Sequence, residues 1–368
     1  MKYHRDNFRH LESEEMIKFK DEIVGDKTVT ICSYMVSSPA LWKLPMAKEC
    51  RGIVWNSAGE CICLPFEKFF NVNENDETQE HVLPFDAYYN VAEKRDGSMV
   101  SAVLINDIVR FKTKKSFYSD VAHNATEYAV TQPQLMRMCK YVLNLGYTPT
   151  FEFTSKSNEV VIDYGPEPQF VLLALRDMIF GNYLSPIEVS KVGKGWDIPT
   201  IKNYGHVPYE ALKSEMAVKE NFEGYVIEFQ NGVRAKMKTE WYLRLHHAKT
   251  DLRERDVAEM FINETLDDIK SVCVTAGLSL EPIERIEMMV VQDIADLIEN
   301  TKEIYGWIRL QESRKEAAIK FRDIAVFGLA MKLLDGKDPD YVKFWKTNYL
   351  KLYSLQNVYG NFNGVKPE

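Results

Sequence analysis

Short apolar segments separated by turn residues dominate the chain up to about residue 240, whereas apolar residues recur every three or four positions after about residue 250. Short runs bounded by turns are typical of strands, and a period near 3.6 is typical of helices. The pattern therefore predicts a mainly antiparallel α+β domain over residues 1–249, followed by a small all-helical domain over residues 250–368.

The first domain is predicted to contain many short strands, of which the clearest are 29–34, 52–55, 98–105, 108–113, 160–163, 170–175, 224–229 and 233–238. Helical stretches are predicted at residues 16–22, 120–130 and 135–145. Between the last two strands, Gln230-Asn231-Gly232 indicates a tight hairpin, since Asn-Gly supplies the positive φ angles of such turns.

Two helical series are predicted in the second domain. One runs from Ile283 to Ile308 with Pro282 near its start, where the fixed φ of proline suits a first helical turn. The other runs from Ala317 to Met331 and is closed by Gly336 and Pro339.

The composition of the chain excludes several classes of protein. The 368 residues are 45% hydrophobic and 27% charged, which indicates a folded chain rather than a largely disordered one. The longest apolar run, Phe170–Leu175, is far shorter than the roughly 20 residues that cross a bilayer, so no transmembrane helix is expected. The N-terminus does not resemble a secretory signal, and six cysteines in so long a chain favour reduced thiols. We therefore expect a cytoplasmic protein with no membrane partner.

The net charge of −8 opposes non-specific binding to nucleic acid, so a nucleic-acid partner would need local basic clusters. Two clusters could follow an RNA backbone, or could equally be solvated faces: Lys112, Lys114 and Lys115, and Arg244, His246, His247 and Lys249. A metal site at Cys61 and Cys63 is disfavoured, because no second pair or nearby histidine completes it. One at His246 and His247 is disfavoured because adjacent side chains on a strand or helix point apart.

The most informative motif is Lys94-Arg95-Asp96-Gly97-Ser98, between two predicted strands. A surface hairpin would explain it alone. However, K-x-D-G-S specifies four positions and would arise by chance in roughly one such chain in a few hundred.

Further blocks occur in a fixed order around this motif: Glu49–Ile53, Glu67–Asn71, Phe151–Phe153, Phe170–Leu173, Glu223–Val226, Lys236–Lys238 and Trp241-Tyr242. In their order and spacing they resemble the covalent nucleotidyltransferase superfamily, and most closely the bacteriophage RNA ligase 1 family of tRNA-repair enzymes. The resemblance runs from about Tyr34 to His246. It implies a domain with the nucleotidyltransferase fold, in which the enzyme becomes adenylated on one of its own residues. Lys115 departs from it, since the family often has glycine there.

The resemblance implies an ATP-dependent RNA ligase that joins 5′-phosphate and 3′-hydroxyl ends, with Lys94 as the catalytic residue that takes AMP from ATP. A lysine attacks only when neutral, and a free lysine with a pKa near 10.4 is about 0.04% neutral at pH 7. Nearby cations and a divalent metal would favour the neutral amine. The implied cofactors are ATP, as substrate, and Mg²⁺ or Mn²⁺; the implied partners are RNA ends, such as a cleaved tRNA, for a chain expected to be a monomer.

Each other residue has a predicted role with a plainer alternative. Arg51, Lys68, Lys236 and Lys238 are expected around the triphosphate, although each could be a solvated strand residue. Glu152 is assigned to the ribose, Glu223 to magnesium, and Asp96 more weakly to the metal. Tyr34 and Phe70 are expected to pack on the nucleotide, or else to be core aromatics, and Glu93 to present backbone groups to adenine. Asp267, the first residue of the acidic pair Asp267-Asp268, is a weak candidate for a second metal, with helix capping as the alternative. The remaining predicted site residues are Gly97, for the close turn, Lys112, Lys114 and Tyr242.

Three other functions remain open from the residues. A DNA ligase or an RNA capping guanylyltransferase would share the motifs but would follow them with a small β-barrel, whereas this sequence becomes helical. An RNA-binding module that has lost catalysis is disfavoured by the intact Lys94, Glu152 and Glu223. The RNA ligase is therefore the predicted function, in the host cytoplasm if the chain is encoded by a phage.

Overall fold

The structure is a computed structural model, and it describes residues 2–35, 37–158, 162–243, 253–275 and 280–353. The chain divides into two compact units, Met1–His246 and His247–Glu368. Each unit has its own elements and its own buried residues, and the two are described in turn.

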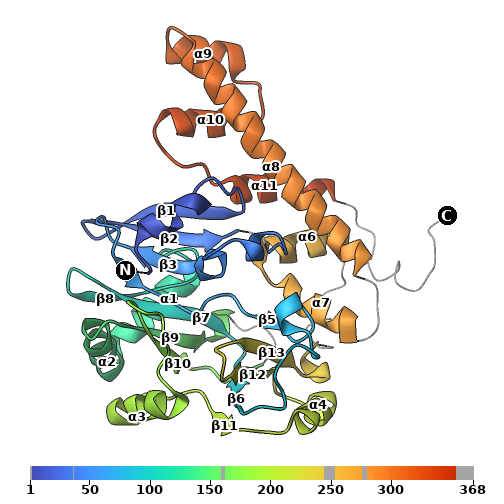
Figure 1. Cartoon of the computed structure of the whole chain (residues 1–368). Helices are drawn as coiled ribbons and strands as arrows, with labels where there is room; N and C mark the ends of the chain where they lie inside the picture. The colour runs from blue at the N-terminus through green and yellow to red at the C-terminus, as the bar shows by residue number, and fades with distance from the viewer. Residues whose placement is uncertain (1, 36, 159–161, 244–252, 276–279, 354–368) are drawn as a thin grey trace, which may run out of the picture. The chain divides into compact units, whose positions relative to one another are not determined.

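Three sheets form most of the first unit (Figure 1). The first has the order β1 (Ile17–Val24), β2 (Lys27–Tyr34), β3 (Arg51–Trp55) and β4 (Cys61–Cys63). The second has the order β10 (Gln169–Asp177), β9 (Tyr147–Thr154), β7 (Ser98–Ile105) and β8 (Ile108–Lys112). The third has the order β11 (Asn203–Gly205), β6 (Tyr89–Lys94), β12 (Gly224–Phe229), β13 (Arg234–Lys238) and β5 (Phe70–Asn71). Among the paired strands in the described part of the chain, β13 and β5 are parallel and the others antiparallel.

The α-helices that accompany these sheets include α1 (Asp120–Val130), α2 (Pro133–Asn144), α3 (Pro186–Trp196) and α4 (Tyr209–Val218). The first begins where the Ser119 side chain accepts a hydrogen bond from Ala122 N, and the second has proline at its start, as helix N-termini favour. The apolar faces of α1, α2 and α3 cover the second sheet, where a buried core includes Phe111, Phe151 and Phe170. Helix α4 instead packs into the core of the third sheet. Short 3₁₀ segments lie at Arg5–Leu11, Leu41–Lys43, Ala47–Glu49, Asp76–Thr78 and Lys156–Asn158.

The described elements of the second unit are helices: α6 (Glu254–Asn263), α7 (Leu266–Thr275), α8 (Glu281–Arg309), α9 (Arg314–Phe321), α10 (Phe327–Leu334), α11 (Tyr341–Asn348) and a 3₁₀ turn, Leu350–Leu352. Helix α8 buries one stripe of apolar residues, from Ile283 through Val290 and Leu297 to Ile308. Helices α6, α10 and α11 pack on α8, so this stripe forms the core of the unit.

The predicted fold class, an antiparallel α+β domain followed by helices, is confirmed. The predicted helix at 120–130 matches α1, and the helix at 135–145 matches α2 within two residues. The hairpin at 230–232 also forms, but of the two predicted positive φ angles only that of Gly232 occurs, while the Asn231 side chain accepts from Val233 N.

One predicted helix is wrong, and one predicted helical series is interrupted. Residues 16–22 lie largely in strand β1, because a turn at Gly25, with φ 67°, lets eight residues of β1 pair with β2. That pairing overrides the local helical pattern. The series from Ala317 to Met331 is divided between α9 and α10 rather than continuous. Residues 160–161 of the predicted strand at 160–163 lie outside the described residues, and residues 162–163 are not in a strand.

No helix among the described residues is both long enough and apolar enough to cross a membrane.

Candidate active site

The register of the third sheet gathers three lysines on one face. Lys94, the last residue of β6, lies directly opposite Gly224 on β12, and Gly224 lies opposite Lys238 on β13. Lys236 precedes Lys238 by two residues on the same strand, so it shares that face. The other face packs into a core that includes Val91, Ile227 and Ala235.

A buried carboxylate joins two of these lysines. Glu223, just before β12 and 2% exposed, accepts at Oε1 from Lys94 Nζ at 2.7 Å and from Lys238 Nζ at 2.9 Å. The strands must approach closely here, because a Cβ on Gly224 would lie 1.9 Å from Met237 O. The glycine after Glu223 therefore allows the bridge to form.

Glu152 on β9 lies among the same charges. Burial raises its pKa to about 8, and the nearby Glu223 and Asp96 carboxylates raise it as well, while Lys94 and Arg51 lower it. The second sheet thus places the Glu152 carboxyl group beside Lys94, the candidate nucleophile on the third sheet. At neutral pH this carboxyl group is largely protonated in the absence of ligand.

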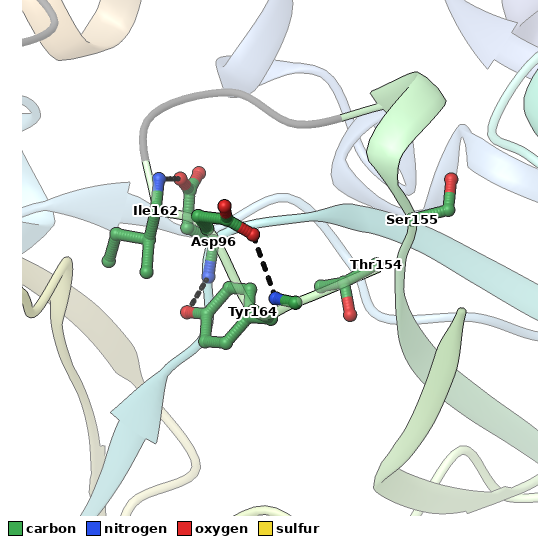
Figure 2. Close-up of a pocket in the computed structure, with 7 residues that line it drawn as sticks. Asp96, Thr154, Ser155, Ile162 and Tyr164 are labelled. Carbon is green, nitrogen blue, oxygen red and sulfur yellow. Dashed lines mark hydrogen bonds between the residues drawn. The ribbon is translucent and has the colours of Figure 1, made fainter. Parts of the chain in front are cut away.

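Asp96 holds the turn that follows Lys94 (Figure 2). Its carboxylate accepts from Tyr242 OH at 2.9 Å and from Ile162 N at 2.8 Å, and its own N–H donates to Tyr164 OH at 3.1 Å. Both carboxylate oxygens are therefore engaged within the protein. This arrangement favours an anchoring role for Asp96 over the weaker metal assignment.

Neighbouring residues complete the same turn. The Arg95 guanidinium lies 3.9 Å from the centre of the Tyr164 ring and donates to Gln169 Oε1. A Cβ on Gly97 would lie 2.8 Å from Phe153 O, so this glycine lets the turn pack directly against β9. Glycine is therefore needed at this turn because the turn approaches β9 closely.

Arg51 and Lys68, two of the predicted phosphate ligands, lie on adjoining segments. Arg51 Nη1 donates to Glu67 O at 3.1 Å, and Lys68 N donates to Lys48 O at 2.8 Å. The Lys68 side chain is 5% exposed, with Nζ 3.6 Å from Glu74 Oε1 and 5.0 Å from the centre of the Phe70 ring.

The predicted aromatic ligands Tyr34 and Phe70 belong to a buried cluster. The two residues are 5% and 1% exposed, and the ring of each makes an edge contact with Trp42. This burial favours the core alternative over stacking on a nucleotide. Lys114 Nζ lies 3.4 Å from the centre of the Tyr34 ring and donates to Tyr34 O at 2.9 Å.

The basic strand end proposed for RNA backbone contact needs a correction. Lys112 is fully buried, and its Nζ donates to Thr113 O at 2.9 Å, so it does not reach a surface that RNA could follow. Burial lowers its pKa. The other proposed basic cluster lies entirely outside the described residues, since Arg244, His246, His247 and Lys249 are all within 244–252.

Two predictions receive partial tests. The backbone N–H of Glu93 donates to Lys202 O at 2.9 Å, so that donor is already used and is not free for a base. Asp267 lies in α7 beside Glu287, whose pKa is raised by burial and by the Asp267 charge, against the effect of Lys270. The side chain of Asp268 is outside the described part of the chain.

Glu223 offers the best fit to a divalent metal. Its Oε2 is buried and has no hydrogen-bond partner among the described residues. In the part of the chain that the structure describes, no group of three or more histidine, cysteine, aspartate or glutamate side chains is arranged to hold a metal ion. Cys61 and Cys63 therefore belong to no such group. Magnesium keeps most of its waters and uses one or two carboxylates plus phosphate oxygens, so one free carboxylate oxygen beside a nucleotide suits it.

Tyr164 and Ile162 were missed by the sequence analysis. The contact of Ile162 is made by its backbone, which carries no side-chain signal, and a single tyrosine outside the family blocks gives none. Their positions depend on how the 162–169 segment returns to the Lys94 turn.

The chain resembles known proteins over most of its length. The family model described as RNA ligase matches residues 49–246. A protein named "Putative RNA ligase" from Thermovibrio ammonificans is 26% identical over 315 residues, which cover 82% of each chain. RNA ligase 1 of bacteriophage TS2126 is 29% identical over 65% of this chain, which spans 62% of the phage protein. A solved structure, "Putative ATP-dependent DNA ligase from Aquifex aeolicus", shares the fold at a TM-score of 0.51 and 12% identity, over 91% of this chain and 99% of the other.

The raised pKa of Glu152 predicts a pH-dependent stability of the ligand-free protein. The folded state keeps the proton up to about pH 8, whereas the unfolded chain loses it near the ordinary value of 4.5. The unfolded state thus binds fewer protons between these values, and stability falls as pH rises, by up to about 1.4 kcal/mol per pH unit.

Glu152→Gln should remove this contribution. Urea unfolding at pH 5, 6, 7 and 8 should show a gap between variant and wild type that widens with pH in favour of the variant, and the exposed control Glu220→Gln should show none. Parallel curves for Glu152→Gln and wild type would contradict the burial of this carboxyl group.

Proposed function

The chain belongs to the RNA ligase family, and on that basis we propose that it is an ATP-dependent enzyme that joins a 5′-phosphate to a 3′-hydroxyl of RNA through AMP bound covalently to Lys94. The observation that supports this most is the arrangement of Lys94 and Lys238 around one buried carboxylate, with Glu152 beside them. A solvated surface hairpin would not bury these charges together.

In the proposed first step, the neutral Lys94 Nζ attacks the α-phosphorus of ATP. A nitrogen–phosphorus bond forms, the bond from the α-phosphorus to the bridging oxygen breaks, and pyrophosphate leaves. The AMP is then transferred to the 5′-phosphate of RNA, which frees the lysine. Finally the RNA 3′-hydroxyl attacks that phosphate, and AMP leaves as the phosphodiester forms.

The cations would stabilise the negative charge on the phosphates of ATP. ATP brings several negative charges, and Arg51, Lys68, Lys236 and Lys238 would bind its phosphoryl oxygens, most strongly as pyrophosphate departs. Glu152 would bind a ribose hydroxyl, which either protonation state of the carboxyl group can do. The Glu223 carboxylate would share its two lysines with the incoming phosphate.

A divalent ion, Mg²⁺ or Mn²⁺, would be held by Glu223 Oε2 together with phosphate oxygens and water. Such an ion neutralises phosphate charge during transfer. Glu223 would then use one oxygen for the lysines and the other for the ion.

The natural substrate is proposed to be a cleaved RNA, such as a tRNA. Repair would take place in the cytoplasm, which is that of the host if the chain is encoded by a phage. The enzyme would act as a monomer. Residues 1–249 would carry out adenylation, and the helices after residue 250 would contribute RNA specificity. The described residues after 253 form helices rather than the strands of a β-barrel, which disfavours the DNA ligase and capping enzyme alternatives.

The nucleophile is tested by labelling with α-labelled ATP. The wild type should become covalently labelled by ATP but not by GTP, and Lys94→Ala or Lys94→Arg should abolish the label, because arginine stays charged at working pH. The exposed control Lys191→Ala should label normally. A label retained by both Lys94 variants would place the nucleophile elsewhere.

Glu223→Gln tests the carboxylate. It keeps the size of the side chain and removes the charge, so single-turnover adenylation should slow by about 100-fold or more, roughly 3 kcal/mol, with an altered magnesium dependence. The exposed Glu210→Gln removes the same charge from α4 and should behave as wild type. An unchanged rate and metal dependence in Glu223→Gln would show that this carboxylate is structural.

The proposed division of labour is tested by truncation. A chain ending at Thr250 should still form the lysyl-AMP, because every proposed adenylation residue precedes that point, but should seal a structured RNA poorly. If the shortened protein is soluble and fails to adenylate, the proposed boundary is refuted.

A further inference from the structure

Arg176 on β10 is a buried arginine that none of the assigned roles uses. It is 3% exposed, and its Nη1 and Nη2 each donate to a different oxygen of Glu49, both at 2.8 Å. Nη1 also donates to Pro65 O at 2.7 Å, and Nε donates to Gly181 O at 3.0 Å. The guanidinium therefore links three segments that are far apart in sequence.

Two of these segments lead directly to the proposed phosphate-binding cations. Glu49 lies two residues before Arg51, and Pro65 lies three residues before Lys68. The segments also contact each other, since Arg51 Nη1 donates to Glu67 O at 3.1 Å and Lys68 N donates to Lys48 O at 2.8 Å. Arg176 thus ties together the two segments from which both cations extend.

We propose that Arg176, through Glu49 and Pro65, is a positioning residue for adenylate formation that sets where Arg51 and Lys68 meet the triphosphate of ATP. This inference rests on the proposed function. The planar guanidinium fixes angles as well as distances, because its paired N–H groups match the two carboxylate oxygens.

Stability alone is a weak explanation for the pair. Replacing a buried ion pair with apolar side chains of similar size is often neutral or stabilising, because the desolvation of both charges is costly. What apolar side chains would not supply is a directed link to Glu49 and Pro65. The pair should therefore matter more for the placement of the cations than for folding.

The test uses the full-length double variant Arg176→Met/Glu49→Leu, which leaves no buried charge unpaired. We expect its unfolding midpoint to stay near that of the wild type, while KM for ATP in adenylation rises about tenfold, the equivalent of about 1.4 kcal/mol. Sealing of an RNA supplied with AMP already on its 5′-phosphate should change by less than about twofold, because that step contains no triphosphate. The control Lys270→Met/Glu287→Leu, a partly buried pair in the helical unit, should leave KM for ATP unchanged.

Two results would overturn the proposal: an unchanged KM for ATP, or an equal loss in adenylation and in sealing of the adenylylated RNA. If the double variant does not fold, Arg176→Lys provides the test, because lysine keeps the positive charge but lacks the planar paired N–H donors of the guanidinium. It should raise KM for ATP and spare the sealing step, and failure to do so would equally refute the idea. A wild-type protein that never forms the lysyl-AMP would instead refute the proposed function.

Discussion

The Glu223 carboxylate is buried between two lysines, and the rest of the site depends on that pairing. Two ammonium groups held close together repel each other, and the shared oxygen of Glu223 offsets that repulsion in the ligand-free protein. A buried carboxylate in turn needs partners, since desolvation of an unpaired charge is costly. The bridge therefore fixes Lys94 at the end of β6 and Lys238 at the end of β13, on one face of one sheet.

The same charge balance explains why Glu152 holds a proton. A third carboxylate beside Glu223 and Asp96 would be repelled by both, and burial adds to the cost, so the pKa of Glu152 rises to about 8. An entering polyphosphate would find cations already gathered and one acidic group neutral. The site is thus arranged for an anion without being strongly positive when empty.

Hydrogen bonds from distant segments hold these groups in place. The turn after Lys94 is bound by Tyr242, which follows the third sheet, and by the 162–164 segment, which precedes β10. Arg176 makes similar hydrogen bonds to the segments that lead to Arg51 and Lys68. Catalytic groups on short turns need such support, because a turn alone leaves side chains free to move.

The sequence by itself determined the fold class, most of the strands, the long helix α8 and the family, because hydrophobic periodicity and motif order are local properties. It also singled out Lys94, Glu152, Glu223 and Lys238, which tertiary structure brings together. Only tertiary structure decided that residues 17–24 pair as a strand and that Lys112 is buried, since both depend on contacts with residues distant in sequence. The partners of Asp96 and Arg176 were decided in the same way: their hydrogen bonds reach backbone groups or side chains up to 173 positions away, and no local pattern records such pairings.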